Sequence, residues 1–175
     1  MKIKACVVAA AVLIAWGLKR HYADSGADDL TWILNPTAQL VSAVTHTSFA
    51  YVPGEGYFSR ERLFLIEKSC AGINFMIAAF GMLVLTLLHR VESGMSSARV
   101  LGLSLLAGYA AAVVVNTVRI AVAMWLAANP VPLVALGADD IHRLEGIVVY
   151  FGGLVLLYEL AQRLDRRAVP ARLAQ

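Results

Sequence analysis

A cysteine, an arginine and a histidine lie in or beside apolar runs of this sequence and could together carry out chemistry. Cys70 has a thiol, and the thiolate that it forms is a strong nucleophile. His142 has an imidazole that titrates near neutral pH and can accept the thiol proton. Arg119 has a fixed charge that could lower the pKa of the thiol or hold a developing oxyanion, and the sequence does not separate these roles. The three residues therefore predict nucleophilic catalysis by a thiol.

The residues around Cys70 favour a functional thiol over an inert one. Gly72 follows the cysteine, and we expect Asn74 to lie one turn further along on the same helical face. Cys6 instead lies in the middle of an apolar run, as small inert cysteines usually do. We therefore expect Gly72 and Asn74 to support the site and Cys6 to take no part in it.

Arg119 needs a physical explanation, because an arginine near the centre of a bilayer costs about 2.5 to 3.5 kcal/mol on translocon scales. It could snorkel to the outer headgroups or pair with a carboxylate such as Glu145. Asn116 lies one turn before it on the same helical face, which favours a polar patch inside a helix bundle. We expect Asn116 to support the site.

His142 opens the last apolar run, with Gly146 and Tyr150 at i+4 and i+8 on one helical face. We include Gly146 among the supporting residues. The sequence has no Cys/His set with zinc spacing, so we predict no metal and no cofactor.

The elements that must position these residues are membrane helices. The chain has 175 residues and is 59% apolar, well above the share typical of soluble domains. Its apolar stretches approach the roughly 20 residues that cross a bilayer as a helix. We predict an all-α, polytopic transmembrane bundle in one domain, 1–175, with about four spans at 3–18, 63–88, 100–128 and 141–160. The third span either tilts or breaks near Asn116, and segment 3–18 is expected to be retained as an anchor.

Basic residues predict how the bundle is oriented. They cluster at the ends of the apolar stretches and in the tail 161–175, as membrane topology requires, and not in a pattern that binds nucleic acid. The positive-inside rule then places both termini in the cytoplasm and the loops 19–62 and 129–140 on the outer face of the membrane. Residues 30–49 are weakly amphipathic and predict a loop helix, either packed or on the membrane surface.

Three short motifs on successive spans resemble those of the exosortase/archaeosortase family. They are Lys68-Ser69-Cys70-Ala71-Gly72-Ile73-Asn74, Asn116-Thr117-Val118-Arg119-Ile120 and His142-xxx-Gly146-xxx-Tyr150, in that order. The resemblance spans about 63–151, and the small number of spans is similar to that of a short exosortase of the K type.

This resemblance implies a multi-pass, inner-membrane cysteine protease or transpeptidase that acts on exported proteins, with its active site on the outer, periplasmic side. Its substrates would carry a C-terminal sorting signal, made of a short motif such as Pro-Glu-Pro, an apolar helix and a basic tail. The resemblance implies that Cys70 is the nucleophile, His142 the proton-transfer partner and Arg119 the third essential residue. An amine on a glycan or lipid could accept the product.

Two other classes stay open on the sequence alone. One is a small transporter or assembly subunit without enzymatic activity, in which Arg119 binds an anion and Cys70 is incidental. The other is a membrane thiol acyltransferase, which would use Cys70 and His142 but give Arg119 no task specific to peptides.

Overall fold

The computed structural model describes the backbone of residues 2–129 and 138–173, and the side chains of residues 2–129 and 144–166. Long helices dominate these residues, so the polytopic helical class is confirmed. In chain order the helices are α1 (Lys2–Asp24), α2 (Thr31–Thr45), α3 (Ile73–Leu87), α4 (Gly94–Ala128) and α5 (Ala138–Leu173). Three short 3-10 turns, η1 (Asp28–Leu30), η2 (Lys68–Ala71) and η3 (Leu88–Arg90), join them. A small sheet contains β1 (Ala50–Val52), β2 (Gly56–Ser59) and β3 (Phe64–Ile66).

Three segments in the described part of the chain are long and apolar enough to cross a membrane, namely Lys68–Arg90, Gly94–Ala128 and Leu144–Arg166. The predicted first span is a helix, α1, but it is not among these three. Its apolar run 5–18 lies between Lys4 and Lys19 and rises only about 20 Å, less than the roughly 30 Å of a hydrocarbon core.

One detail of the predicted spans differs from the structure, and one alternative that the sequence left open is decided. The second span was expected to begin near Leu63, but β3 occupies Phe64–Ile66 and the helix α3 begins only at Ile73. The third span has no break near Asn116, because α4 is one continuous helix of 35 residues.

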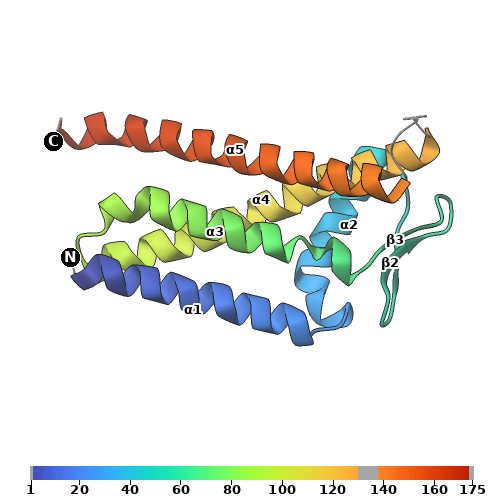
Figure 1. The fold of residues 1–175 in the computed structure, drawn as a ribbon, viewed down its shortest axis with the longest axis horizontal. Coiled ribbons are helices and arrows are strands. Elements are labelled where there is room, and N and C mark those ends of the chain that lie inside the picture. Colours follow the sequence, from blue (N-terminus) through green and yellow to red (C-terminus); the bar gives the residue numbers. More distant parts are fainter. Residues whose placement is uncertain (1, 130–137, 174–175) are drawn as a thin grey trace. The chain divides into compact units, whose positions relative to one another are not determined.

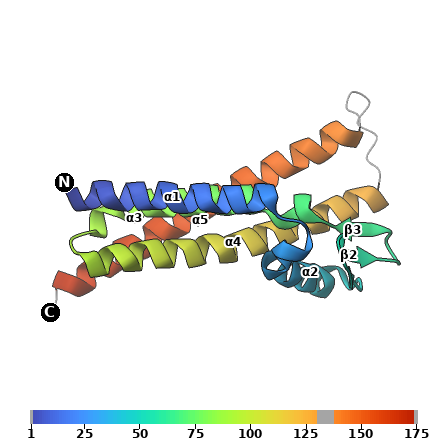
Figure 2. The ribbon, with the colours of Figure 1, turned by 90° about the horizontal axis from the view of Figure 1, so that it is seen from below.

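The chain forms two compact units, which we describe separately. The first contains residues 1–21, 73–112 and 153–175. In it α1, α3 and the first part of α4 lie side by side (Figures 1 and 2), around a core of buried apolar residues. Val7 and Ala11 of α1 join Phe80 and Val84 of α3 in this core. At the other end of the pair, Lys19 Nζ donates to Asn74 Oδ1 at 2.7 Å, so α1 runs antiparallel to α3.

The close packing of α3 and α4 depends on Gly108. A Cβ atom there would lie 3.2 Å from the backbone nitrogen of Phe80 and 3.3 Å from the carbonyl oxygen of Met76. Small residues at this point let the two helix backbones approach closely.

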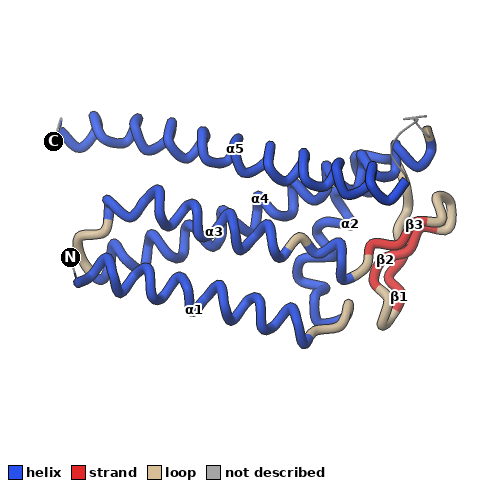
Figure 3. The backbone as a smooth tube through the Cα atoms, in the orientation of Figure 1, coloured by secondary structure: helices blue, strands red, loops and turns tan. Residues whose placement is uncertain are grey.

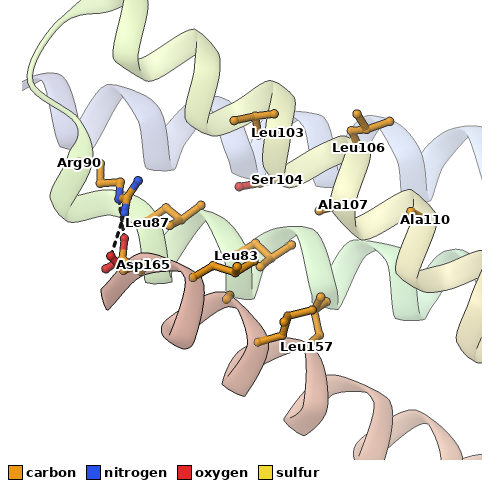
Figure 4. A pocket seen from close by; sticks show the side chains of 13 residues that line it. Leu83, Leu87, Arg90, Leu103, Ser104, Leu106, Ala107, Ala110, Leu157 and Asp165 are labelled. Atoms are coloured by element: carbon orange, nitrogen blue, oxygen red, sulfur yellow. Dashed lines mark hydrogen bonds and ion pairs between the residues drawn. The ribbon is translucent and has the colours of Figure 1, made fainter. Parts of the chain in front are cut away.

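An apolar crevice of about 420 Å³ lies in the first unit between α3, α4 and α5 (Figure 4). Leucines of all three helices form its walls, and Ala107 and Ala110 of α4 keep it open. At one end Asp165 forms ion pairs with Arg90 and with His89, the latter at 3.1 Å. These ion pairs link the 3-10 turn η3 to the C-terminal part of α5.

The second unit contains residues 22–72 and 113–152. Its sheet is antiparallel in the order β1-β2-β3 (Figure 3), and residues 53–55 connect the first two strands. Asp28 holds this hairpin, since its carboxylate accepts hydrogen bonds from the Tyr51 hydroxyl at 2.7 Å and the Gly54 amide at 2.8 Å. These two bonds lower the pKa of Asp28.

The helix predicted within residues 30–49 is α2, and it is packed. Its buried face consists of Ile33, Leu34, Thr37, Ala38 and Val41, and it contacts β2 and η2. The helix α2 thus packs against the turn η2, which contains Cys70 and follows β3 in the chain.

Candidate active site

Cys70 lies in the 3-10 turn η2, between the last strand and α3. Its amide donates to the carbonyl of Glu67 at 2.9 Å, which closes the turn. Gly72 ends the turn with a φ of +68°, a conformation that a residue with a Cβ rarely adopts. The Cys70 side chain is half-buried, and its sulfur lies 3.9 Å from the hydroxyl of Ser69. The thiol is therefore partly accessible on a backbone of fixed shape.

Lys68 and Ser69 stabilise the same turn through polar contacts. The Lys68 ammonium donates to the carbonyls of Ala23 at 3.2 Å and Ser25 at 2.6 Å. The Ser69 hydroxyl donates to the Glu67 carboxylate at 2.7 Å. Both residues belong to the Cys70 motif, but no individual role was predicted for them.

Asn116 of α4 contacts the Cys70 turn directly. Its side chain is fully buried, and its amide nitrogen donates to the backbone carbonyl of Cys70. A Cβ at Gly72 would lie 3.3 Å from Asn116 Cγ, so the glycine lets this side chain approach the turn. Asn116 and Gly72 were both expected to support the site, and the structure places them in contact with its backbone.

Arg119, one turn further along α4, contacts α5. Its guanidinium donates to the Tyr150 hydroxyl at 3.3 Å and lies 5.4 Å from the centre of the Tyr150 ring. A Cβ at Gly146 would lie 3.3 Å from Arg119 Nε, so this glycine leaves space for the guanidinium. The Tyr150 hydroxyl in turn donates to Asn116 Oδ1 at 2.9 Å.

The structure thus brings Cys70, Gly72, Asn116, Arg119 and Gly146 together within the second unit. Tyr150 joins them, although the sequence analysis placed it only on the helical face that His142 and Gly146 share. Its spacing of four residues from Gly146 was the available signal, because residues four apart share a helical face.

Two other predicted site residues, Asn74 and His142, are not among the side chains that the structure brings together here. Asn74 does not share a helical face with Cys70, because Cys70 precedes α3, and its side chain bonds to Lys19 in the first unit. His142 lies near the start of α5, about two turns before Tyr150, but its side chain is outside the described residues.

The contact between Asn116 and Cys70 also gives the position of the site along α4. Asn116 lies about 18 Å along the helix axis from the end of α4 at Ala128. The turn η2 packs beside α4 one helical turn from Arg119, so Cys70 and Arg119 lie at similar positions along α4.

The sequence profile of the transmembrane exosortases matches residues 30–159, about three quarters of the chain. This region includes Cys70, Arg119 and His142. No curated protein and no solved structure matches the chain. The helices long enough to span a bilayer and the extent of this match lead to one conclusion: the chain is a multi-pass membrane protein that belongs to the transmembrane exosortase family.

Proposed function

We propose that the chain is a membrane-embedded cysteine protease or transpeptidase that removes the C-terminal sorting signal of exported proteins. The observation that carries this proposal is the hydrogen-bonded contact of Asn116 with the Cys70 turn, one helical turn from Arg119. This contact brings the turn that carries a half-buried thiol against the part of α4 that carries Arg119, and a cation near a thiol would favour the thiolate nucleophile. Assignment to the K type stays a prediction.

The proposed reaction proceeds in two steps. The Cys70 thiolate attacks the scissile carbonyl carbon, and the resulting oxyanion collapses to a thioester as the peptide C–N bond breaks. His142, protonated by the thiol, gives this proton to the leaving nitrogen, and Arg119 stabilises the negative charge. Water or an amine of a glycan or lipid then attacks the thioester, which releases the substrate and returns the proton and the thiol.

Co-expression with a tailed substrate tests this function. We expect loss of the tail in cells that contain the chain, and a hydroxylamine-labelled substrate terminus if a thioester forms. A transporter or assembly subunit would leave the tail in place. A thiol acyltransferase would instead form a thioester with lipid acyl groups and leave the peptide uncut.

The length of α4 agrees with a site near one membrane boundary. Its 35 residues extend about 50 Å, whereas the hydrocarbon core is about 30 Å thick. We propose that the C-terminal part of α4, with Arg119 and the surrounding second unit, extends toward the outer face. Arg119 would then avoid the full cost of an arginine at the bilayer centre.

Reporter fusions should show both termini in the cytoplasm and Gly56 outside. The reason is that the positive-inside rule assigns the side with the basic tail 161–175 to the cytoplasm. Because α1 packs along α3, we expect it to be the fourth crossing even though its apolar run is short. A tag before Lys2 and fusions after Gly56, His89 and Gln175 measure this. An external tag before Lys2 together with an external Gly56 would remove the fourth crossing, and a cytoplasmic Gly56 would contradict the substrate proposal.

We also propose that the crevice of the first unit receives the apolar helix of the sorting signal. Large apolar side chains of α5 in the first unit, Val155, Leu156 and Leu160, are exposed, so this helix offers an apolar face to another helix. The Ser104 hydroxyl at the crevice is buried and has no hydrogen-bond partner among the described residues. Ala107 and Ala110 beside it allow close helix packing.

A photo-crosslinker in place of Leu106, which lines the crevice, should therefore capture a co-expressed tailed substrate. The matched control is Leu13, which is similarly exposed on α1 but lies outside the crevice. Immunoblotting of the crosslinked product measures the difference. Equal capture at both positions, or crosslinks at Leu106 to lipid alone, would contradict docking in the crevice.

A further inference from the structure

Four groups of the second unit form a hydrogen-bond chain whose direction is fixed by chemistry. A guanidinium can only donate, so the Tyr150 hydroxyl accepts from Arg119 at 3.3 Å. The hydroxyl has a single hydrogen, which it donates to Asn116 Oδ1 at 2.9 Å. The amide of Asn116 is thereby oriented with its nitrogen toward the Cys70 carbonyl, to which it donates. Every donor in the chain points from Arg119 toward Cys70.

We propose that Tyr150 is a positioning residue that, through Asn116, fixes the backbone of the Cys70 turn relative to Arg119. This inference rests on the proposed function. The tyrosine hydroxyl links α5 to α4 directly, and Asn116 extends this link from α4 to η2. Nothing in the proposal requires Tyr150 to touch the substrate.

The burial of Asn116 explains why the link needs a hydroxyl. Asn116 is fully buried and its oxygen accepts a hydrogen bond from the Tyr150 hydroxyl. Without that donor the buried amide loses the hydrogen bond that sets its orientation. If the amide rotates, its oxygen would face the Cys70 carbonyl and the two would repel. Removal of the Tyr150 hydroxyl should therefore disturb the Cys70 turn, which Asn116 contacts.

Tyr150→Phe keeps the ring that lies beside Arg119 but removes the hydroxyl. We expect kcat to fall on the order of 10- to 100-fold with little change in KM, because small displacements of a reacting group have effects of this size. The assay uses the full-length Cys6→Ser protein in proteoliposomes with a tailed peptide, and rates are divided by the amount of Cys70 titrated with a thiol reagent. A purely structural role would lower the number of titratable sites and leave the rate per site unchanged.

Two further variants sharpen the test. Asn116→Asp cannot donate to the Cys70 carbonyl, so it should show the same loss, and Tyr150→Phe added to it should cost little more. Tyr158→Phe is the matched control, because Tyr158 lies two turns further along α5 and its hydroxyl accepts from Gln162 instead. It should process normally.

A second measurement separates this inference from the proposed function. In a Cys6→Ser background Cys70 is the remaining thiol, and a loosened turn should change its rate of alkylation by maleimide severalfold in Tyr150→Phe but not in Tyr158→Phe. An unchanged alkylation rate together with an unchanged rate per site overturns the positioning role. If no variant or wild type cuts the tailed peptide, the proposed function fails, and the alkylation rates alone decide whether Tyr150 fixes the turn.

Discussion

Cys70→Ala should abolish removal of the sorting signal while the folded protein persists in the membrane. Alanine cannot form a thioester, so we expect the rate to fall on the order of 10⁴-fold or more, as loss of a nucleophile does in other covalent enzymes. The fold should tolerate the change for a specific reason. The contacts that hold the turn, from Asn116 and to Glu67, use the backbone of Cys70, which alanine retains.

The matched control for this prediction is Cys6→Ser. Cys6 is exposed on α1 in the first unit, and we expect normal processing when its sulfur is replaced. Immunoblots of the membrane fraction, with tail loss followed over time, measure both variants at equal protein level. Normal processing by Cys70→Ala would end the thiol hypothesis.

Much of the helical fold could be predicted because apolar runs near 20 residues have few alternatives in a membrane protein. The small sheet could not be predicted in the same way. Its strands contain three or four residues each, and the run 63–66 is apolar, so it reads equally well as the start of a helix. Only pairing with β2, which is a tertiary contact, decides that these residues are extended.

The error in this segment also affected the predicted site. Because Cys70 was taken to lie on a helix, Asn74 was expected on its face, whereas the turn η2 and the positive φ of Gly72 separate the two. Asn116 was predicted for a sounder reason, since it shares a continuous helix with Arg119. The contact of Tyr150 with that pair depends on how α5 packs against α4, which spacing along one helix does not give.

Arg119→Ala and His142→Gln should each lower the rate of tail removal strongly, and the double variant should cost little more than the worse single variant. Glutamine cannot take up a proton near neutral pH, so His142→Gln should cost on the order of 10² to 10⁴ if His142 is the general acid and base. Loss of a group that stabilises an oxyanion costs on the order of 10² to 10³. When two residues act on one thiol in one reaction, the losses of rate caused by their substitutions do not add. The double variant therefore distinguishes a shared site from two independent defects.

Arg119→Lys separates the two roles proposed for the arginine. Lysine keeps the charge but loses the planar fork that reaches Tyr150, so severe impairment indicates that donor geometry matters, and near-normal activity indicates that charge suffices. Arg163→Ala is the matched control, because Arg163 is an exposed arginine of α5 in the first unit. The measurement is tail loss over time at equal protein level. Near wild-type rates for both Arg119→Ala and His142→Gln would contradict the site, and full additivity in the double variant would contradict joint action on Cys70.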